Sequence, residues 1–154
     1  MKTQNHSSCR GFSIVELLIV AAIIGLITAI AIPNLLNAIQ RSRQTRTVSD
    51  MRGLSNGIAM YQQVFAKFPV ASSYVAVEEL RPDLAPFIGE GMVTVDAWQR
   101  SFYYKSNGDF YTLVSYALDG TATEPWTEGI TTLFEDDIVI VDGNFLQIPQ
   151  GAQN

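Results

Sequence analysis

A long, largely apolar segment, Phe12 to Ile32, constrains this chain more than any other feature. Its 21 residues, FSIVELLIVAAIIGLITAIAI, would form a helix of about 30 Å, which matches the hydrocarbon core of a bilayer. We therefore predict that the segment spans a membrane. It contains a carboxylate, Glu16, and an acid inside a bilayer costs roughly 2.5 to 3.5 kcal/mol on insertion scales. Glu16 is thus a functional residue that requires a partner.

A short polar leader precedes this segment. It carries Lys2 and Arg10, contains no acid and ends at Gly11. The order GFSIVELLIVAAIIGLITAIAIPNLL resembles the leader and anchor of type IV prepilins, which type IV pilins and type II secretion pseudopilins share. The resemblance implies that a membrane aspartyl peptidase cuts between Gly11 and Phe12 and methylates the new amine. It also implies that Glu16 pairs with the Phe12 amine of the neighbouring filament subunit, which offsets the desolvation of the carboxylate.

Two other interpretations of the apolar segment are a secretory signal peptide and a plain single-pass anchor. Ala29-Ile30-Ala31 imitates a signal-peptidase site, but the apolar stretch exceeds the roughly 7 to 15 residues of a signal and contains Glu16. The four arginines between residues 41 and 52 outnumber the basic residues of the leader, against the positive-inside rule. The resemblance, and not the charge pattern, places the leader in the cytoplasm. We expect the arginines to form a solvated basic face or to meet lipid phosphates or neighbouring acids.

Composition excludes most catalytic chemistry. The cysteine, Cys9, and the histidine, His6, both belong to the leader, so the mature chain would lack disulfides, thiolate or imidazole zinc sites and His-activated nucleophiles. Loss of Lys2 and Arg10 takes the formal charge from -5 to -7, which offers no footprint for nucleic acid. We predict that the protein is not an enzyme, with a membrane-anchored carboxylate enzyme as a remote alternative.

The rest of the chain predicts an α+β fold of the type IV pilin kind, in which a long N-terminal helix packs on a small antiparallel sheet. Pro33, with Gly25 before it, predicts a bend or a melted stretch. Beyond it, apolar residues from Leu36 to Phe65 recur mostly at steps of three and four, as in an amphipathic helix. The expected segments are the cleaved leader (1–11), the transmembrane and assembly helix (12–34), its amphipathic continuation (35–68) and a periplasmic head (69–154).

Turn residues define the strands expected in the head. Residues 102–105 and 110–115 flank Ser-Asn-Gly-Asp and predict a β-hairpin. A further strand, 138–141, turns at Asp-Gly-Asn into 145–148. Residues 70–99 contain several proline and glycine breakers, so we expect an irregular loop with one helical turn at 75–80.

The head also resembles one branch of the prepilin family, the major pseudopilin of type II secretion. The matching stretches are YQQVFAKFPV at 61–70 and DAWQRSFYYKSNGDFYTLVSYALDG at 96–120. That branch has an Asp-x-Trp-Gly element before its hairpin, and Gln99 stands here in place of the glycine. The resemblance implies a subunit of a helical homo-oligomer, the periplasmic pseudopilus, that drives folded proteins through an outer-membrane channel. A type IV pilin of a surface fibre is second, because the paired cysteines of many pilins are missing.

The same resemblance implies partners and a location. The partners are the prepilin peptidase and N-methyltransferase, the minor pseudopilins, an inner-membrane assembly platform and, before assembly, membrane lipid. The protein would cross the bacterial inner membrane once and hold its head in the periplasm.

The pseudopilin branch binds calcium in the loop between its hairpin and its final strand. The resemblance implies that the ligands are the side chains of Asp119, Asp136 and Asp137, with backbone oxygens near Ser115 and Leu118. Calcium takes six to eight oxygen ligands at about 2.3 to 2.6 Å, and it would clamp a loop that no disulfide can close. The insertion TATEPWTEGITTLF is longer than we expect for this branch, and an acidic turn that stays solvated is the alternative.

Overall fold

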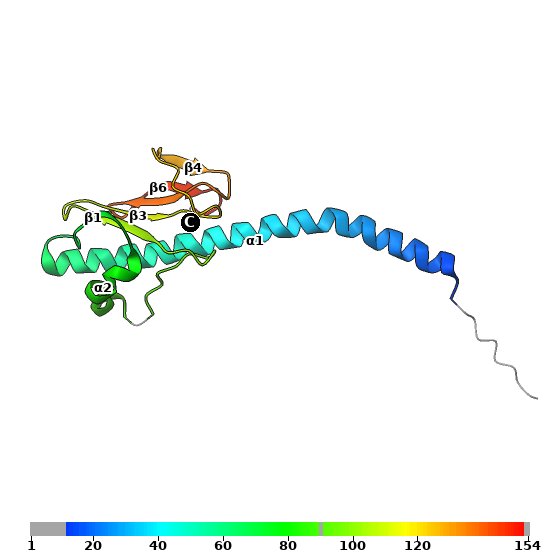
Figure 1. Ribbon diagram of the computed structural model, residues 1–154, viewed down its shortest axis with the longest axis horizontal. Helices are drawn as coiled ribbons and strands as arrows, with labels where there is room; N and C mark the ends of the chain where they lie inside the picture. The colour runs from blue at the N-terminus through cyan, green and yellow to red at the C-terminus, as the bar shows by residue number, and fades with distance from the viewer. Residues whose placement is uncertain (1–11, 90, 153–154) are drawn as a thin grey trace, which may run out of the picture. The chain divides into compact units, whose positions relative to one another are not determined.

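A computed structural model describes residues 12–89 and 91–152, with a long helix and a sheet-containing head (Figure 1). The chain divides into two compact units, with the boundary after Ala38. The elements, in chain order, are α1 (Ile14–Phe65), β1 (Ala71–Ala76), the 3-10 helix η1 (Val77–Leu80), α2 (Arg81–Ile88), β2 (Tyr103–Ser106), β3 (Tyr111–Ser115), β4 (Gly129–Thr131), β5 (Ile138–Val141) and β6 (Asn144–Pro149). The predicted α+β class is confirmed.

In the first unit, α1 has no core of its own. Large apolar side chains are exposed along it, from Phe12 at 69% to Leu36 at 55%. An 18-residue window of α1 has a mean hydropathy of 2.7, and none of it is buried. By length and composition this part of the helix can cross a membrane. A helix this apolar in a water-soluble core would be mostly buried.

The expected melted stretch near Pro33 is absent from the described helix, which continues from Ile14 to Phe65 with Pro33 inside it. A proline removes its own backbone donor and one hydrogen bond. Strong helix-forming residues on both sides, such as Ala31 before Pro33 and Leu35 after it, keep the remaining bonds.

In the second unit, the C-terminal half of α1 supplies one wall of the core. Val48, Met51, Leu54 and Ile58 are at most 2% exposed, and their steps of three and four place them on one helical face. They pack with buried side chains of the sheet, which include Tyr104, Leu113 and Ile140. The predicted amphipathic face is thus confirmed over its middle part, whereas Leu36, Ile39 and Phe65 at its ends are exposed.

The sheet has six strands in the order β1-β2-β3-β5-β6-β4. All neighbours are antiparallel except β4 and β6, which are parallel. The predicted hairpin is confirmed as β2 and β3, with Tyr103 opposite Val114 and Ser106 opposite Tyr111. Its turn is an Asx turn, because the Asn107 side-chain oxygen accepts the backbone N–H groups of residues 109 and 110.

The irregular loop expected at 70–99 is wrong for its first part, although the helical turn expected at 75–80 is confirmed by η1. This region forms β1, η1 and α2, and only its later part, from Gly89 to Gln99, lacks a helix or a named strand in the described residues. Pro82 was the misleading residue, because it stands at the start of α2, where a missing N–H costs nothing. The strand β1 pairs only with β2 at the edge of the sheet.

The face of the sheet opposite α1 is also covered. Val114 and Val139 point to this face, since side chains alternate along a strand and their neighbours Leu113 and Ile140 point to the core. Both valines are fully buried. Residues 116–137, which run from the end of β3 to the start of β5, are called the excursion here; its strand β4 extends the sheet beside β6, and its aromatic residues Tyr116 and Trp126 meet this face.

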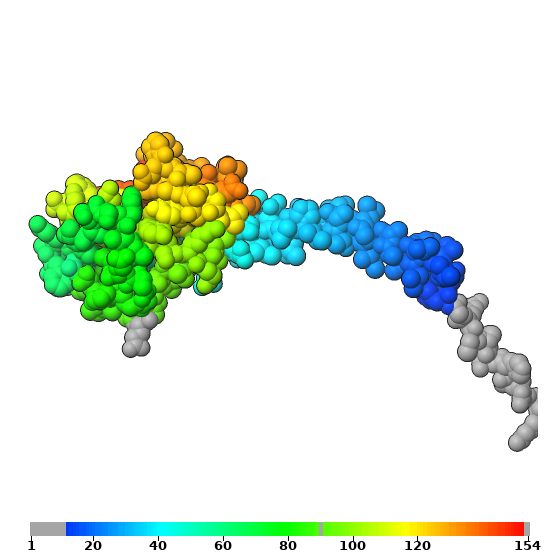
Figure 2. Space-filling view, viewed as in Figure 1, coloured from blue at the N-terminus to red at the C-terminus, as the bar shows by residue number. Residues whose placement is uncertain are grey.

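Aromatic side chains attach the excursion to the sheet. Tyr116 stacks on Tyr103 at a centroid distance of 4.8 Å, and Trp126 meets Tyr74 edge-on at 6.0 Å. Burial raises the pKa of Tyr116 to about 12. Figure 2 shows part of the excursion as a raised yellow and orange mass on the head. Side chains on the second face of the sheet and side chains of the excursion therefore form a second, small core.

Two glycines of α1 give opposite predictions. A Cβ added at Gly57 would overlap the side chain of Ile88 in α2, whereas a Cβ at Gly53 would meet nothing. Alanine is favoured over glycine in a helix by about 1 kcal/mol, and overpacking typically costs about 1 to 3 kcal/mol. We expect Gly53→Ala to stabilise the head by up to about 1 kcal/mol and Gly57→Ala to destabilise it by about 1 kcal/mol. Denaturant unfolding followed by tryptophan fluorescence measures both, and a stabilising Gly57→Ala would contradict the close approach of α2.

Candidate functional site

The predicted assembly residues lie where α1 begins. Phe12 and Ser13 precede the helix, and the Ser13 hydroxyl accepts the N–H of Val15 at 3.3 Å. Glu16 lies in the first turn, where the positive end of the helix dipole favours an acid. The predicted cleavage residue, Gly11, lies outside the described residues.

Glu16 has no partner within the described part of the chain. The ion pairs there are Arg46 with Asp50 and Arg81 with Glu78. Phe12 and Glu16 are four residues apart and exposed, so a carboxylate and the amine of a chain starting at Phe12 would share one end of the helix. This arrangement can present both charges to a second molecule.

A second cluster of polar contacts centres on Asp137, which is fully buried at the end of the excursion. Its Oδ2 accepts three hydrogen bonds, from the N–H of Thr123 at 2.8 Å, from the Thr123 hydroxyl at 3.0 Å and from Nε1 of Trp126 at 2.6 Å. Its Oδ1 is buried and has no hydrogen-bond partner within residues 12–89 and 91–152. Asp137 therefore ties the middle of the excursion to the sheet and keeps one acceptor unused.

The other two predicted calcium carboxylates bind locally. Asp119 accepts the N–H of Thr121 at 3.1 Å and also its hydroxyl, and the bond to that hydroxyl lowers the pKa of Asp119. Asp136 accepts the N–H of Leu133 at 3.0 Å. Over residues 12–89 and 91–152, no three His, Cys, Asp or Glu side chains gather where they could hold a metal.

Of the predicted backbone ligands, Ser115 ends β3 and Leu118 lies near the start of the excursion. The hydroxyl of Ser115 donates to Asp96 at 2.8 Å, and the N–H of Leu118 donates to the carbonyl of Phe134. The structure thus places all five predicted calcium residues in one region but does not converge their side chains. Calcium binding stays a prediction, for which the unused oxygen of Asp137 is the favourable observation.

Asp96 organises the turn that contains Gln99, where this chain differs from the Asp-x-Trp-Gly element of the pseudopilin branch. Asp96 is 1% exposed, and its Oδ1 accepts the N–H groups of Trp98 and Arg100. Gln99 adopts a φ of 66°, a left-handed conformation in which glycine is the usual residue. The turn nevertheless closes, since the N–H of Gln99 donates to the Asp96 carbonyl at 3.0 Å.

Thr123 and Trp126 are the site residues that sequence reasoning missed. Neither follows a periodic pattern, and both lie more than ten residues from Asp137. The available signal was a tryptophan in an otherwise polar loop, because a buried indole N–H needs an acceptor.

Substitution of Trp126 tests this cluster. Trp126→Phe keeps a ring on Tyr74 but removes the donor to the Asp137 carboxylate, and a hydrogen bond to a charged group contributes about 1.5 to 3 kcal/mol. Trp98→Phe is the matched control, because it removes a bond to the neutral amide of Gln40, worth about 0.5 to 1.5 kcal/mol. We expect urea unfolding, followed by circular dichroism, to show the larger loss for Trp126→Phe. An equal or smaller loss would show that the Asp137 contact adds nothing special.

Comparison with known families identifies the family of this chain. A model of the prokaryotic N-terminal methylation motif matches residues 6–32, and a model of protein G of the type II secretion system matches residues 34–131. The chain belongs to the type II secretion system protein G family. The predicted membership of the pseudopilin branch is confirmed.

Individual relatives support the assignment of this chain to the protein G family. The type II secretion system core protein G of Escherichia coli K12 is 28% identical over 120 residues, which cover 72% of this chain and 83% of the relative. The core protein G of Aeromonas hydrophila is 26% identical over 121 residues, 73% and 85% of the two chains. A type IV major pilin of Myxococcus xanthus is 47% identical over 45 residues, which cover 29% of this chain and 20% of the pilin. No solved structure matches the chain.

Proposed function

We propose that this protein is a filament subunit of the type II secretion pseudopilus, processed after Gly11 and assembled through residues 12–34. The observation that carries the proposal is the adjacency of two matches, the methylation motif over 6–32 and protein G over 34–131. The apolar part of α1, none of which is buried, supports it, because such a surface requires lipid or neighbouring helices.

Processing would create the partner of Glu16. Cleavage leaves the Phe12 amine at the start of α1, where the helix dipole disfavours a cation. A carboxylate partner would therefore stabilise the amine. Each charge alone is costly in a low dielectric, and a pair with good geometry repays part of that cost. The ion pair between Glu16 and the Phe12 amine of the next subunit would therefore favour the docked state over the free subunit in lipid.

The finer partners and the location follow from the family. The prepilin peptidase would process and methylate the chain, and minor pseudopilins and an inner-membrane platform would assemble it. Before assembly the subunit would rest in the bacterial inner membrane with its head in the periplasm. The role is structural and not enzymatic, in keeping with relatives that are named core proteins of the secretion system.

A type IV pilin of a surface fibre is the second candidate. The short match to the Myxococcus xanthus pilin, at 47% identity, favours it for a limited segment. The protein G match extends through the helix and most of the head to residue 131, which favours the pseudopilin.

Glu16→Leu tests the assembly contact. Removal of the charge should leave membrane insertion equal or better, because the carboxylate opposes insertion, while filament formation should fail. Filaments are counted by electron microscopy after overproduction, and mass spectrometry should find methylated Phe12 in the variant. Thr28→Leu, which removes a neutral polar group from the same span, is the control and should assemble. Wild-type assembly by Glu16→Leu would refute the proposed ion pair.

We also propose that calcium closes the excursion. Asp137 would contribute its unused Oδ1, and Asp119 and Asp136 would turn from Thr121 and Leu133 toward the ion. Backbone oxygens near Ser115 and Leu118 would complete the oxygen shell that calcium prefers. Bound there, the ion would add electrostatic attraction between the two ends of the excursion.

A melting experiment tests the calcium site. An ion that binds only the folded state stabilises it by about 2.7 kcal/mol at a hundredfold excess over its dissociation constant, so Tm should rise by several degrees with calcium over chelator. Asp136→Ala should remove the difference, whereas Glu135→Ala, at the exposed neighbour, should keep it. Magnesium should substitute poorly, because it requires a tighter octahedral shell. Superimposable curves with calcium and chelator would mean that the Thr123, Trp126 and Asp137 contacts close the excursion without metal.

A further inference from the structure

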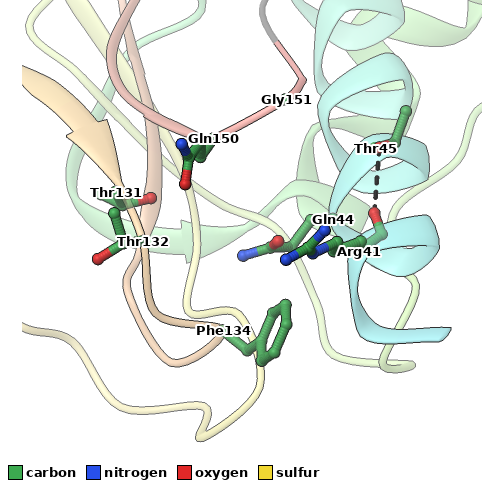
Figure 3. A pocket seen from close by; sticks show the side chains of 8 residues that line it. All are labelled: Arg41, Gln44, Thr45, Thr131, Thr132, Phe134, Gln150 and Gly151. Atoms are coloured by element: carbon green, nitrogen blue, oxygen red, sulfur yellow. Dashed lines mark hydrogen bonds between the residues drawn. The ribbon is translucent and has the colours of Figure 1, made fainter. Parts of the chain in front are cut away.

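A polar pocket of about 370 Å³ opens in the head between α1, the end of β4 and the C-terminal turn (Figure 3). Its volume lies at the lower end of the range for ligand pockets, about 300 to 1,000 Å³. None of the eight residues that line it is acidic. Its polar side chains come from Arg41, Gln44, Thr45, Thr131, Thr132 and Gln150.

Arg41 supplies the charge in this pocket. Figure 3 shows its side chain and that of Gln44 extending from α1 toward the opposite wall, which carries Thr131 and Gln150. The ion pairs of the described residues involve Arg46 and Arg81 and leave the Arg41 guanidinium without an acid. A cation in a pocket without acids attracts an anion.

Two buried side chains show that the pocket is built and not a surface hollow. Gln44 is 5% exposed and is held by donation of its Nε2 to the carbonyl of Leu133 at 3.2 Å. Thr131 is 9% exposed, and its hydroxyl has no hydrogen-bond partner among the described residues. An unsatisfied buried hydroxyl is unfavourable, so a ligand that accepts its proton would improve the pocket.

The chemistry of the lining selects an oxyanion. A guanidinium, threonine hydroxyls and glutamine amides all donate hydrogen bonds, and guanidinium pairs strongly with phosphate or carboxylate. The ligand must therefore carry a negative charge on several oxygens.

The position of Arg41 along the chain identifies the anion. Residues 17–40 contain no charged side chain, so Arg41 is the first cation after the predicted membrane span. The exposed apolar surface continues past the predicted span to Leu35 and Leu36, and the five helical residues from Leu36 to Arg41 rise about 7.5 Å. The headgroup layer is roughly 5 to 7 Å thick on each side of the hydrocarbon. Phospholipid phosphates are thus the anions that Arg41 reaches first.

We infer that this pocket binds the phosphate of a phospholipid headgroup while the subunit resides in the membrane. Arg41 pairs with the phosphate, and the Thr131 hydroxyl and the Gln150 amide donate to its oxygens. The inference rests on the proposed membrane anchoring and adds a specific lipid contact to it. The carboxylate of a neighbouring subunit has similar chemistry and is the alternative that the experiment separates.

The test is native mass spectrometry of the full chain released from detergent, with phosphatidylglycerol titrated in. Arg41→Gln and Thr131→Val should each weaken lipid retention, and Arg41→Gln by at least about tenfold, equivalent to about 1.4 kcal/mol. Arg43→Gln is the matched control. It removes the same charge two residues further along α1, and the Arg43 side chain does not line the pocket. It should change retention by less than about twofold. Equal losses for Arg41→Gln and Arg43→Gln would mean that diffuse attraction to basic residues holds the lipid, and would contradict the proposed phosphate site.

The choice of lipid identifies the recognised group. Phosphatidylglycerol and phosphatidylcholine, which share the phosphate, should both be retained, and diacylglycerol, which lacks it, should not. Retention of diacylglycerol, or binding of inorganic phosphate without binding of either phospholipid, would contradict the inference.

Separate readouts distinguish this inference from the proposed function. Loss of insertion of the wild-type chain into lipid vesicles would contradict the membrane anchoring itself. Normal insertion with unchanged lipid retention in Arg41→Gln would contradict only the pocket. If that variant also failed to form filaments, the occupant would be a carboxylate of the next subunit. Tryptophan fluorescence of each variant shows that the head remains folded.

Discussion

The structure depends on the burial of one face of α1 against the sheet. Val48, Met51, Leu54 and Ile58 form a wall of the head's core, while the apolar residues before Ala38 have no protein partner in the described chain. Each fully buried aliphatic side chain contributes about 1.5 to 3 kcal/mol, so the later part of the helix cannot leave the head without unfolding it. The part of α1 before Ala38 has no such contacts in the described chain, so it can pack against lipid or against other helices.

Much of this fold follows from local sequence signals. The apolar segment, the Asn-Gly turn and the Asp142-Gly143 turn each rest on a strong pattern, and each element was predicted within a few residues. The strands β1 and β4 carry no such pattern, because β1 is an edge strand in which four of six residues are alanine or serine and β4 has three residues that pair only after the excursion folds back. The helix α2 was missed since its two prolines, Pro82 and Pro86, signal a break, although a proline in the first turn, such as Pro82, also suits a helix start.

The site residues divide in the same way. Gly11, Phe12 and Glu16 came from a contiguous motif, which a single sequence can reveal. Asp137 was expected among the acids at the end of the loop, but its partners Thr123 and Trp126 depend on how a segment without periodicity folds over the sheet. The pocket at Arg41 joins residues about 90 positions apart and could not be predicted from spacing.

The two edge strands of the sheet decide how readily this protein would pair with other chains at high local concentration. A long, flat edge strand invites pairing with another chain, yet β4 has three residues and β1 carries an irregular register against β2. By covering the side of β6, the excursion hides a six-residue strand that would otherwise template such pairing. Release of the excursion would therefore expose the edge of β6 to pairing with another chain. The fastening of this loop thus protects the solubility of the subunit as well as the stability of its fold.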